Sequence, residues 1–141
     1  MYKIIYFSSA TKLLDEVEIN SLLVKAHHYN FEKGITGVLL YLEGDFLQVL
    51  EGKKADVVIL FDKIKKDSRH QLIITIFEQK ISKRQFPDWT MGFHSSTYEK
   101  LRRIKGLETI EKRNLVNIND KSVLTFLNKF IKSHKEAISF W

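Results

Sequence analysis

The 141-residue sequence contains no cysteine, which excludes disulfide bonds, thiolate nucleophiles and zinc or iron–sulfur sites built on cysteine. It also has no apolar run that approaches the length needed to cross a membrane. The N-terminus, MYKIIYFSSA, lacks the basic segment and the long apolar segment of a secretory signal, and it is typical of a strand. We therefore expect a cytoplasmic protein with no membrane partner.

Motifs for metal, phosphate or hydrolytic chemistry are missing as well. His27 and His28 are adjacent on a predicted helix and so point apart, and we expect no metal site. No glycine-rich phosphate loop and no Ser/His/Asp arrangement rises above chance. At 141 residues the chain also has no room for a cyclase or phosphodiesterase domain beside the one domain that its length predicts. We therefore do not expect an enzyme.

The net charge of +6 is concentrated near the C-terminus. Residues 1–96 carry 13 basic and 12 acidic side chains, a net charge of +1, whereas residues 97–141 carry 10 and 5, a net charge of +5. Nucleic acid or an acidic partner could meet this basic segment. No nucleic-acid motif accompanies the charge, so we interpret it as a solvated helix face and do not expect nucleic acid as a partner.

Hydrophobic periodicity predicts an α+β domain. The predicted elements are a strand at 2–8, a helix at about 15–30, strands at 35–42 and 45–51, a helix at 54–67, a strand at 72–77 and a short strand around 90–93. Glu43 and Gly44 predict a tight hairpin turn between the second and third strands. The order β-α-β-β-α-β-β is that of a ferredoxin-like fold, with one mixed sheet and two helices on one face.

Several predicted strands are apolar on both sides, which indicates that both faces of the sheet are covered. The two helices cover one face. A C-terminal helix beginning near 119–120 is predicted to pack on the other, because four apolar residues share one of its sides: Val123, Leu127, Phe130 and Ile131. We therefore expect a domain at 1–96 and a helical extension at 97–141 that is not an independent domain.

Three polar residues lie where the pattern predicts burial. Asn30 ends the apolar stripe of the first predicted helix. Tyr6 and Gln48 are in the middle of predicted strands, and Gln48 faces the same way as Phe46 and Leu50. Buried phenol and carboxamide groups must find hydrogen-bond partners or cost stability. Each alone can be satisfied by its neighbours, but together the three favour a polar slot between helix and sheet.

Two further pairs of residues are candidates for this slot. Arg69 and His70 follow the second predicted helix, where positive charge can also simply complete the helix dipole. Trp89 and Met91 are two apart on an extended segment, which predicts that they face the same side. Taken alone, this second pair is typical of core filling rather than of ligand contacts.

Five stretches of sequence form a specific set. They are IIYFSSA at the first strand, N-x3-GITGVLLY at 30–41, GDFLQVLEG at 44–52, KIKKDSRH at 63–70 and FPDWTMGF at 86–93. In this order and at these separations the set resembles the BLUF family, the flavin-based blue-light sensors of bacteria. The resemblance runs from residue 2 to about residue 94, and the fold of that family is the ferredoxin-like fold that the periodicity predicts independently.

The resemblance implies a bound flavin, usually FAD with FMN or riboflavin as alternatives, whose ring lies between the two helices and against the sheet. Tyr6 matches the light-reactive tyrosine of the family, and Gln48 matches the glutamine between that tyrosine and the flavin. Asn30 matches the asparagine that binds the pyrimidine end of the ring. Tyr29 departs from the pattern, because many members carry Asn or His there and gain a second polar contact to the ring or its side chain.

Further positions carry over in the same way. Arg69 and His70 match a basic pair near the carbonyl edge of the ring, and Ser8 matches a serine near the tyrosine strand. Trp89 and Met91 match the pair on the fifth strand that relays the signal.

The family mechanism implies that light moves an electron and a proton from Tyr6 to the flavin and leaves Gln48 rearranged. We expect the output to pass from the fifth strand through helices in 97–135 to an unidentified partner protein. We also expect a homo-oligomer.

Three other functions are possible for a protein of the predicted fold, and the sequence lacks the motifs of the first two. An acylphosphatase needs a phosphate-cradling loop with an arginine after the first strand, and residues 7–11 contain none. An RNA-binding sheet of the RRM type needs aromatic residues beside a basic one on its third strand, whereas DFLQVLE has one aromatic residue and acidic flanks. A flavin-binding redox or scaffold module of the same fold remains the alternative to a light sensor.

Overall fold

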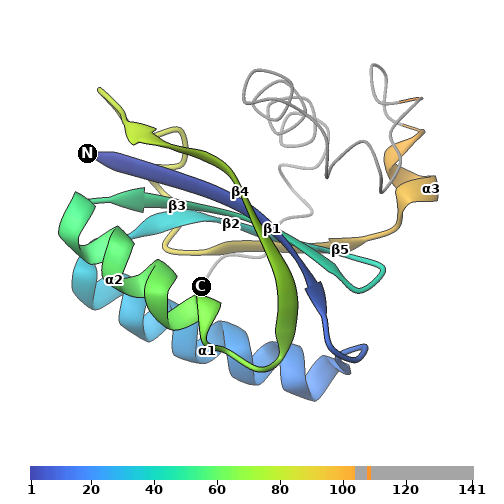
Figure 1. The fold of residues 1–141 in the computed structure, drawn as a ribbon. Coiled ribbons are helices and arrows are strands. Elements are labelled where there is room, and N and C mark those ends of the chain that lie inside the picture. The colour runs from blue at the N-terminus through green and yellow to red at the C-terminus, as the bar shows by residue number, and fades with distance from the viewer. Residues whose placement is uncertain (104–107, 109–141) are drawn as a thin grey trace.

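The computed structural model describes residues 1–103 and 108, which form one sheet with helices packed on it. The elements are β1 (Tyr2–Ala10), α1 (Glu16–Lys33), β2 (Thr36–Leu42), β3 (Asp45–Gly52), α2 (Lys54–Lys65), β4 (His70–Lys80), β5 (Gly92–Ser96) and α3 (Tyr98–Leu101). The strand order is β4-β1-β3-β2-β5, antiparallel throughout apart from the parallel pair β2–β5. Helices α1 and α2 lie side by side on one face (Figure 1). The predicted ferredoxin-like α+β fold is confirmed.

Helix α1 is capped at both ends, by Asp15 before its first turn and by Gly34 after its last. The Asp15 carboxylate accepts the backbone N–H of Glu18 at 2.8 Å, and the Glu18 side chain in turn accepts the backbone N–H of Asp15. Gly34 ends the helix in the left-handed conformation, with φ of 66°. The helix therefore runs slightly past its predicted end, and Asn30 lies in its last turn rather than at its end.

The turn between β2 and β3 is the predicted tight hairpin. Glu43 and Gly44 both have positive φ, 53° and 89°, as a two-residue hairpin turn of type I′ requires. This turn sets the register in which Leu39 pairs with Gln48. On the other side of β3, Gln48 pairs with Tyr6 of β1, so the two residues lie directly opposite one another.

The pleat of the sheet divides the buried residues into two cores. The helix-face core contains Ile4, Tyr6, Leu39, Leu50 and Met91 among others, and α1 and α2 cover it. The far-face core is formed by the alternate strand residues together with side chains from outside the sheet: Phe86, Trp89, Tyr98 and Leu101. Both faces are thus covered, as predicted. The predicted covering helix around 119–131 lies outside the described residues.

The segment before β5 differs from its prediction. The strand begins at Gly92, so Trp89 and Met91 precede it rather than lie on it. Trp89 belongs to the far-face core and Met91 to the helix-face core, so the prediction that they face the same side is wrong. Side chains alternate between the two faces only within a strand, and here the chain has just passed through a turn. The Gly37 N–H donates to the Trp89 carbonyl at 2.9 Å and so holds this turn against β2.

Strand β4 is an edge strand and is longer than predicted. Its pairing with β1 shifts register between Ile5 and Tyr6 and again between Phe7 and Ser9. Leu72 lies at the second irregularity with φ of 54°, and 72% of its surface is exposed. Such bulges redirect the side chains around them, and here the bulge stands opposite Ser8. Among the described residues, no helix is long and apolar enough to cross a membrane.

Candidate functional site

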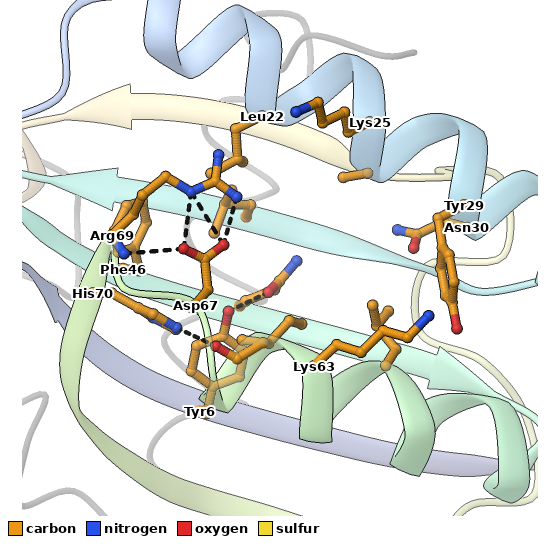
Figure 2. Close-up of a pocket in the computed structure, with 15 residues that line it drawn as sticks. Tyr6, Leu22, Lys25, Tyr29, Asn30, Phe46, Lys63, Asp67, Arg69 and His70 are labelled. Atoms are coloured by element: carbon orange, nitrogen blue, oxygen red, sulfur yellow. Dashed lines mark hydrogen bonds and ion pairs between the residues drawn. The ribbon is translucent and has the colours of Figure 1, made fainter.

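A cavity of about 340 Å³ lies between α1, α2 and the helix face of the sheet. Pockets for small organic ligands are typically about 300–1,000 Å³. Five of the residues singled out in the sequence line it: Tyr6, Asn30, Gln48, Arg69 and His70. Figure 2 shows Arg69 and His70 at one end of the cavity and Asn30 with Tyr29 at the other. The predicted polar slot between helix and sheet is therefore present.

Tyr6 and Gln48 form the floor of this cavity. Both are buried, and the Tyr6 hydroxyl donates a hydrogen bond to Gln48 Oε1. Gln48 Nε2 donates to the thioether sulfur of Met91 at 3.5 Å. A thioether is a weak acceptor, so the donor side of the carboxamide is less firmly held than its acceptor side.

The environment of Tyr6 keeps its phenol neutral. Burial raises the pKa of Tyr6 well above its ordinary value because it disfavours the phenolate, and the nearby Asp67 carboxylate adds to this effect. The ring of Tyr6 also contacts Phe61, with centroids 5.3 Å apart. The phenol thus keeps its proton at physiological pH and holds it along the hydrogen bond to Gln48.

Asn30 is held at the opposite wall with one atom unused. The side chain is 1% exposed, and Nδ2 donates to the Thr90 carbonyl at 3.2 Å. Within residues 1–103 and 108, Oδ1 has no hydrogen-bond partner. Leaving a buried acceptor unpaired costs about 1–3 kcal/mol. The amide oxygen is therefore placed to accept an N–H from a ligand in the cavity.

His70 links the strand and the second helix. Its Nε2 lies 2.5 Å from the Ile64 carbonyl, which can only accept, so this nitrogen carries the proton and donates. The Ser8 hydroxyl lies 2.8 Å from Nδ1 and donates to it in the neutral ring. Ser8 is fully buried behind His70 and does not line the cavity, so its contact is with the histidine.

Arg69 is paired with Asp67 at the mouth of the cavity. Its Nε and terminal nitrogen bind the Asp67 carboxylate at 2.9 and 2.5 Å (Figure 2). Hydrogen bonding to Arg69 lowers the pKa of Asp67 below its usual value, and the same bond raises the pKa of Arg69. The Arg69 guanidinium thus forms an ion pair with Asp67 and does not serve only as a positive charge near the C-terminus of α2.

Two lysines complete the cavity from opposite helices. Lys25 lines it from α1 and Lys63 from α2, where the ammonium lies 4.6 Å over the ring of Tyr29 (Figure 2). The sequence reasoning missed both lysines and also Asp67. A signal was present, because Lys25 precedes Tyr29 by one helical turn and Lys63 precedes Asp67 in the same way. The charged residues that line the cavity, Lys25, Lys63, Asp67 and Arg69, carry a net positive charge, which favours an anionic group.

The chemistry of the cavity suits an organic ligand that carries both hydrogen-bond donors and acceptors. Carboxamides at the floor and at the far wall offer both donors and acceptors, and the lysines favour a negatively charged tail. In the part of the chain that the structure describes, no three His, Cys, Asp or Glu side chains gather to hold a metal ion. Fold and cavity together define a ferredoxin-like domain with a cavity of ligand size between its two helices and its sheet.

The family model for BLUF, described as sensors of blue-light using FAD, matches residues 1–92. The chain therefore belongs to the BLUF family of flavin-binding blue-light sensors, which confirms the resemblance noted in the sequence. It is 35% identical over 106 residues to photoactivated adenylate cyclase subunit beta of Euglena longa, and 33% identical over 105 residues to subunit alpha of Euglena gracilis. These alignments cover 74% of this chain but 12% and 10% of those relatives. The chain thus spans only about a tenth of their length.

Solved structures of similar fold include BLUF proteins and a larger protein. The BlsA ground state has a TM-score of 0.78 at 27% identity, covering 91% of this chain and 85% of that one. The dark state of BlrB has a TM-score of 0.72 at 28% identity, covering 94% and 96%. Klebsiella pneumoniae BlrP1, solved with FMN and cyclic diGMP, has a TM-score of 0.61 at 28% identity, covering 70% and 26%.

Proposed function

We propose that this chain is a blue-light photoreceptor in which a flavin ring occupies the cavity, Tyr6 donates an electron and a proton, and Gln48 is the switch. The observation that carries the proposal is the buried hydrogen bond from Tyr6 to Gln48 on the cavity floor. It joins an oxidisable group to a side chain whose hydrogen bonds can be arranged in two ways.

The residues present fit a flavin. The pyrimidine end of a flavin carries an N–H between two carbonyl groups, and the unpartnered Oδ1 of Asn30 is an acceptor for that N–H. Lys25 and Lys63 would hold a phosphate of the flavin side chain, which favours FAD or FMN over riboflavin. Mass spectrometry of the ligand released from the purified chain distinguishes the three, and we expect FAD.

The protein's part in the photocycle is a proton transfer followed by a side-chain rearrangement. When bound, the flavin supplies light absorption and an excited state that accepts an electron. Transfer of an electron from Tyr6 to the flavin would make the Tyr6 phenol strongly acidic, so its proton would follow to the flavin along the hydrogen bond through Gln48. When electron and proton have returned to Tyr6, the carboxamide remains rotated or tautomerised. The net change is one of hydrogen bonding alone, and it decays in the dark.

The signal leaves the cavity through the contacts of Gln48. Rearranging the carboxamide removes Nε2 from the Met91 sulfur, which it contacts at 3.5 Å. Met91 and Trp89 lie immediately before β5, which leads into α3. We propose that this path carries the output from the photosensory unit at 1–96 to the extension at 97–141 and then to a partner protein.

Self-association is also part of the proposal. Three apolar side chains on α1, Val17, Val24 and Phe31, are exposed by 77%, 41% and 72%. They are spaced by two helical turns and so share one face of the helix. Light scattering of the full chain tests this, and we expect a mass above that of one 16.6 kDa chain.

Absorption spectroscopy of the purified chain tests the photoreceptor proposal. We expect a yellow protein whose absorption shifts reversibly to the red under blue light. Tyr6→Phe and Gln48→Leu should each abolish that shift while leaving flavin bound. Tyr41→Phe is the matched control, because it removes a buried phenol from the same core but outside the cavity.

Two outcomes would contradict the proposal. A normal red shift in Tyr6→Phe or Gln48→Leu would refute the roles assigned to these residues. A yellow protein that shows no light-induced shift would instead indicate the redox or scaffold module.

A further inference from the structure

Glu51 of β3 is a buried carboxylate on the face of the sheet opposite the cavity. It is 0% exposed and lies three residues after Gln48 on the same strand. Its two oxygens accept the backbone N–H of Gln85 at 2.8 and 3.1 Å, and one of them accepts the backbone N–H of Phe86 at 2.8 Å. A buried carboxylate is tolerated only where such donors satisfy it. Glu51 therefore binds the loop backbone to the middle of the sheet.

The charge of Glu51 is balanced by an equally buried lysine. Lys3 of β1 lies 3.5 Å from the Glu51 carboxylate, and its ammonium also donates to Gln85 Oε1 at 2.6 Å. Arg84 adds a third connection, donating to the Glu51 carbonyl at 3.2 Å and to Thr36 Oγ1 at 2.8 Å. Residues 84–86 are thus fastened to β1, β2 and β3 by side chains.

The segment fastened in this way ends at the residues that accept hydrogen bonds from the two carboxamides of the cavity. Residues 81–91 connect β4 to β5, and Trp89 stacks on Phe86 with centroids 5.5 Å apart. Next along the chain, the Thr90 carbonyl accepts from Asn30 Nδ2 and the Met91 sulfur accepts from Gln48 Nε2. Both carboxamides of the cavity therefore donate to one short stretch of this segment.

We propose that Glu51 is a positioning residue of the photoswitch. It fixes residues 84–86 on the far face, and through the Phe86–Trp89 stack it fixes the acceptors that Thr90 and Met91 present to Asn30 and Gln48. The inference rests on the proposed function of Tyr6 and Gln48. Glu51 lies outside the cavity, yet it would control how easily Gln48 changes its hydrogen bonds.

The variant Glu51→Gln tests this in the full chain. It keeps the size of the side chain but replaces one acceptor oxygen by a donor, which faces the backbone N–H groups of Gln85 and Phe86. Asp45→Asn is the matched control, because Asp45 is a similarly buried carboxylate on β3 that accepts hydrogen bonds from Ser9 and Tyr98. A Trp141→Phe background leaves Trp89 as the single indole.

The first readout needs no flavin. In the flavin-free protein, Glu51→Gln should speed hydrogen exchange at Gln85 and Phe86 and change the emission of Trp89, whereas Asp45→Asn should do neither. The second readout is the dark recovery of the illuminated protein. When residues 81–91 are free to move with the Gln48 carboxamide, the activation barrier of dark recovery is lower. We therefore expect Glu51→Gln to recover about tenfold faster, which corresponds to a barrier lower by about 1.4 kcal/mol.

The inference is overturned if Glu51→Gln leaves the dark recovery unchanged, whatever happens to hydrogen exchange and emission. It is also overturned if Asp45→Asn accelerates recovery as much at a similar melting temperature, because the effect would then follow stability alone. If Glu51→Gln does not fold, Arg84→Met is the second variant. It removes only the hydrogen bonds from Arg84 to Thr36 and to the Glu51 carbonyl, so both readouts should change in the same direction but by less. No shift in that variant would also reject the inference.

Failure of the proposed function is distinguishable. A normal red shift in Tyr6→Phe would refute the switch, while the exchange and emission data would still report the anchoring by Glu51. Conversely, a lost shift in Tyr6→Phe combined with unchanged recovery in Glu51→Gln would reject the positioning role alone.

Discussion

The buried carboxylates on the far face of the sheet have more hydrogen-bond partners than the buried carboxamides on its helix face. On the far face, the Glu51 carboxylate is held by two backbone N–H groups and a lysine, and the Asp45 carboxylate by the Tyr98 hydroxyl at 2.8 Å. On the helix face, Asn30 Oδ1 lacks a partner among the described residues and Gln48 Nε2 donates to a thioether. The satisfied carboxylates thus act as scaffold, whereas the two carboxamides of the cavity keep spare hydrogen-bonding capacity for a ligand.

The largest expected effect is on the far face. Glu51→Leu leaves Lys3 buried without its partner and two backbone N–H groups without an acceptor, so we expect the free energy of unfolding to fall by roughly 3–5 kcal/mol. Urea denaturation measures this. The double variant Lys3→Met/Glu51→Leu should recover part of the loss. A loss below that of the exposed control Glu78→Gln would contradict the scaffold role.

The matching change on the helix face should act on ligand affinity instead. Asn30→Ala removes one hydrogen bond to Thr90, so the flavin-free protein should lose only about 1 kcal/mol of stability. Flavin binding should weaken by about tenfold, because the acceptor for the ligand N–H is gone. Fluorescence titration with flavin measures the affinity. Asn20→Ala, at an exposed position of the same helix, is the control and should change neither quantity.

The mouth of the cavity should show a dependence on pH. Arg69 lowers the pKa of Asp67 in the folded state, so this pair stabilises the fold above the ordinary pKa of an aspartate. The contribution is lost as the pH falls through the lowered pKa. Urea midpoints of the wild type and Asp67→Asn should therefore differ at pH 7 and converge in acid. A difference that persists unchanged in acid would contradict the ion pair's role.

The smallest expected effect lies at the edge of the sheet. Leu72 has φ of 54°, a conformation that costs a non-glycine residue roughly 1–2 kcal/mol. Leu72→Gly should therefore stabilise the protein by about 0.5–1 kcal/mol after the entropy cost of glycine. Ile74→Gly, on the same strand with no positive φ, should destabilise it. Thermal unfolding compares the two, and a loss in Leu72→Gly would show that its side chain is needed.

Much of the cavity could be predicted from the sequence because it depends on regular elements. Tyr6 and Gln48 lie mid-strand, where alternation decides which face they occupy, and Asn30 lies on the buried stripe of a helix. Lys25 and Lys63 were missed because lysines are common on the exposed faces of helices, so their spacing from Tyr29 and Asp67 does not distinguish them from other surface lysines. Their place at the cavity follows from how α1 and α2 lie on either side of it (Figure 2).

The sequence by itself determined the order of elements, the hairpin and which residues face the same way as Tyr6 and as Gln48 along their own strands. Short-range periodicity and turn chemistry specify these features without reference to distant residues. Only the tertiary structure decided that Trp89 and Met91 part to opposite faces and that Glu51 holds the loop backbone at 85–86. The path of a segment without periodicity is set by contacts with distant strands, such as the bond from Gly37 to Trp89.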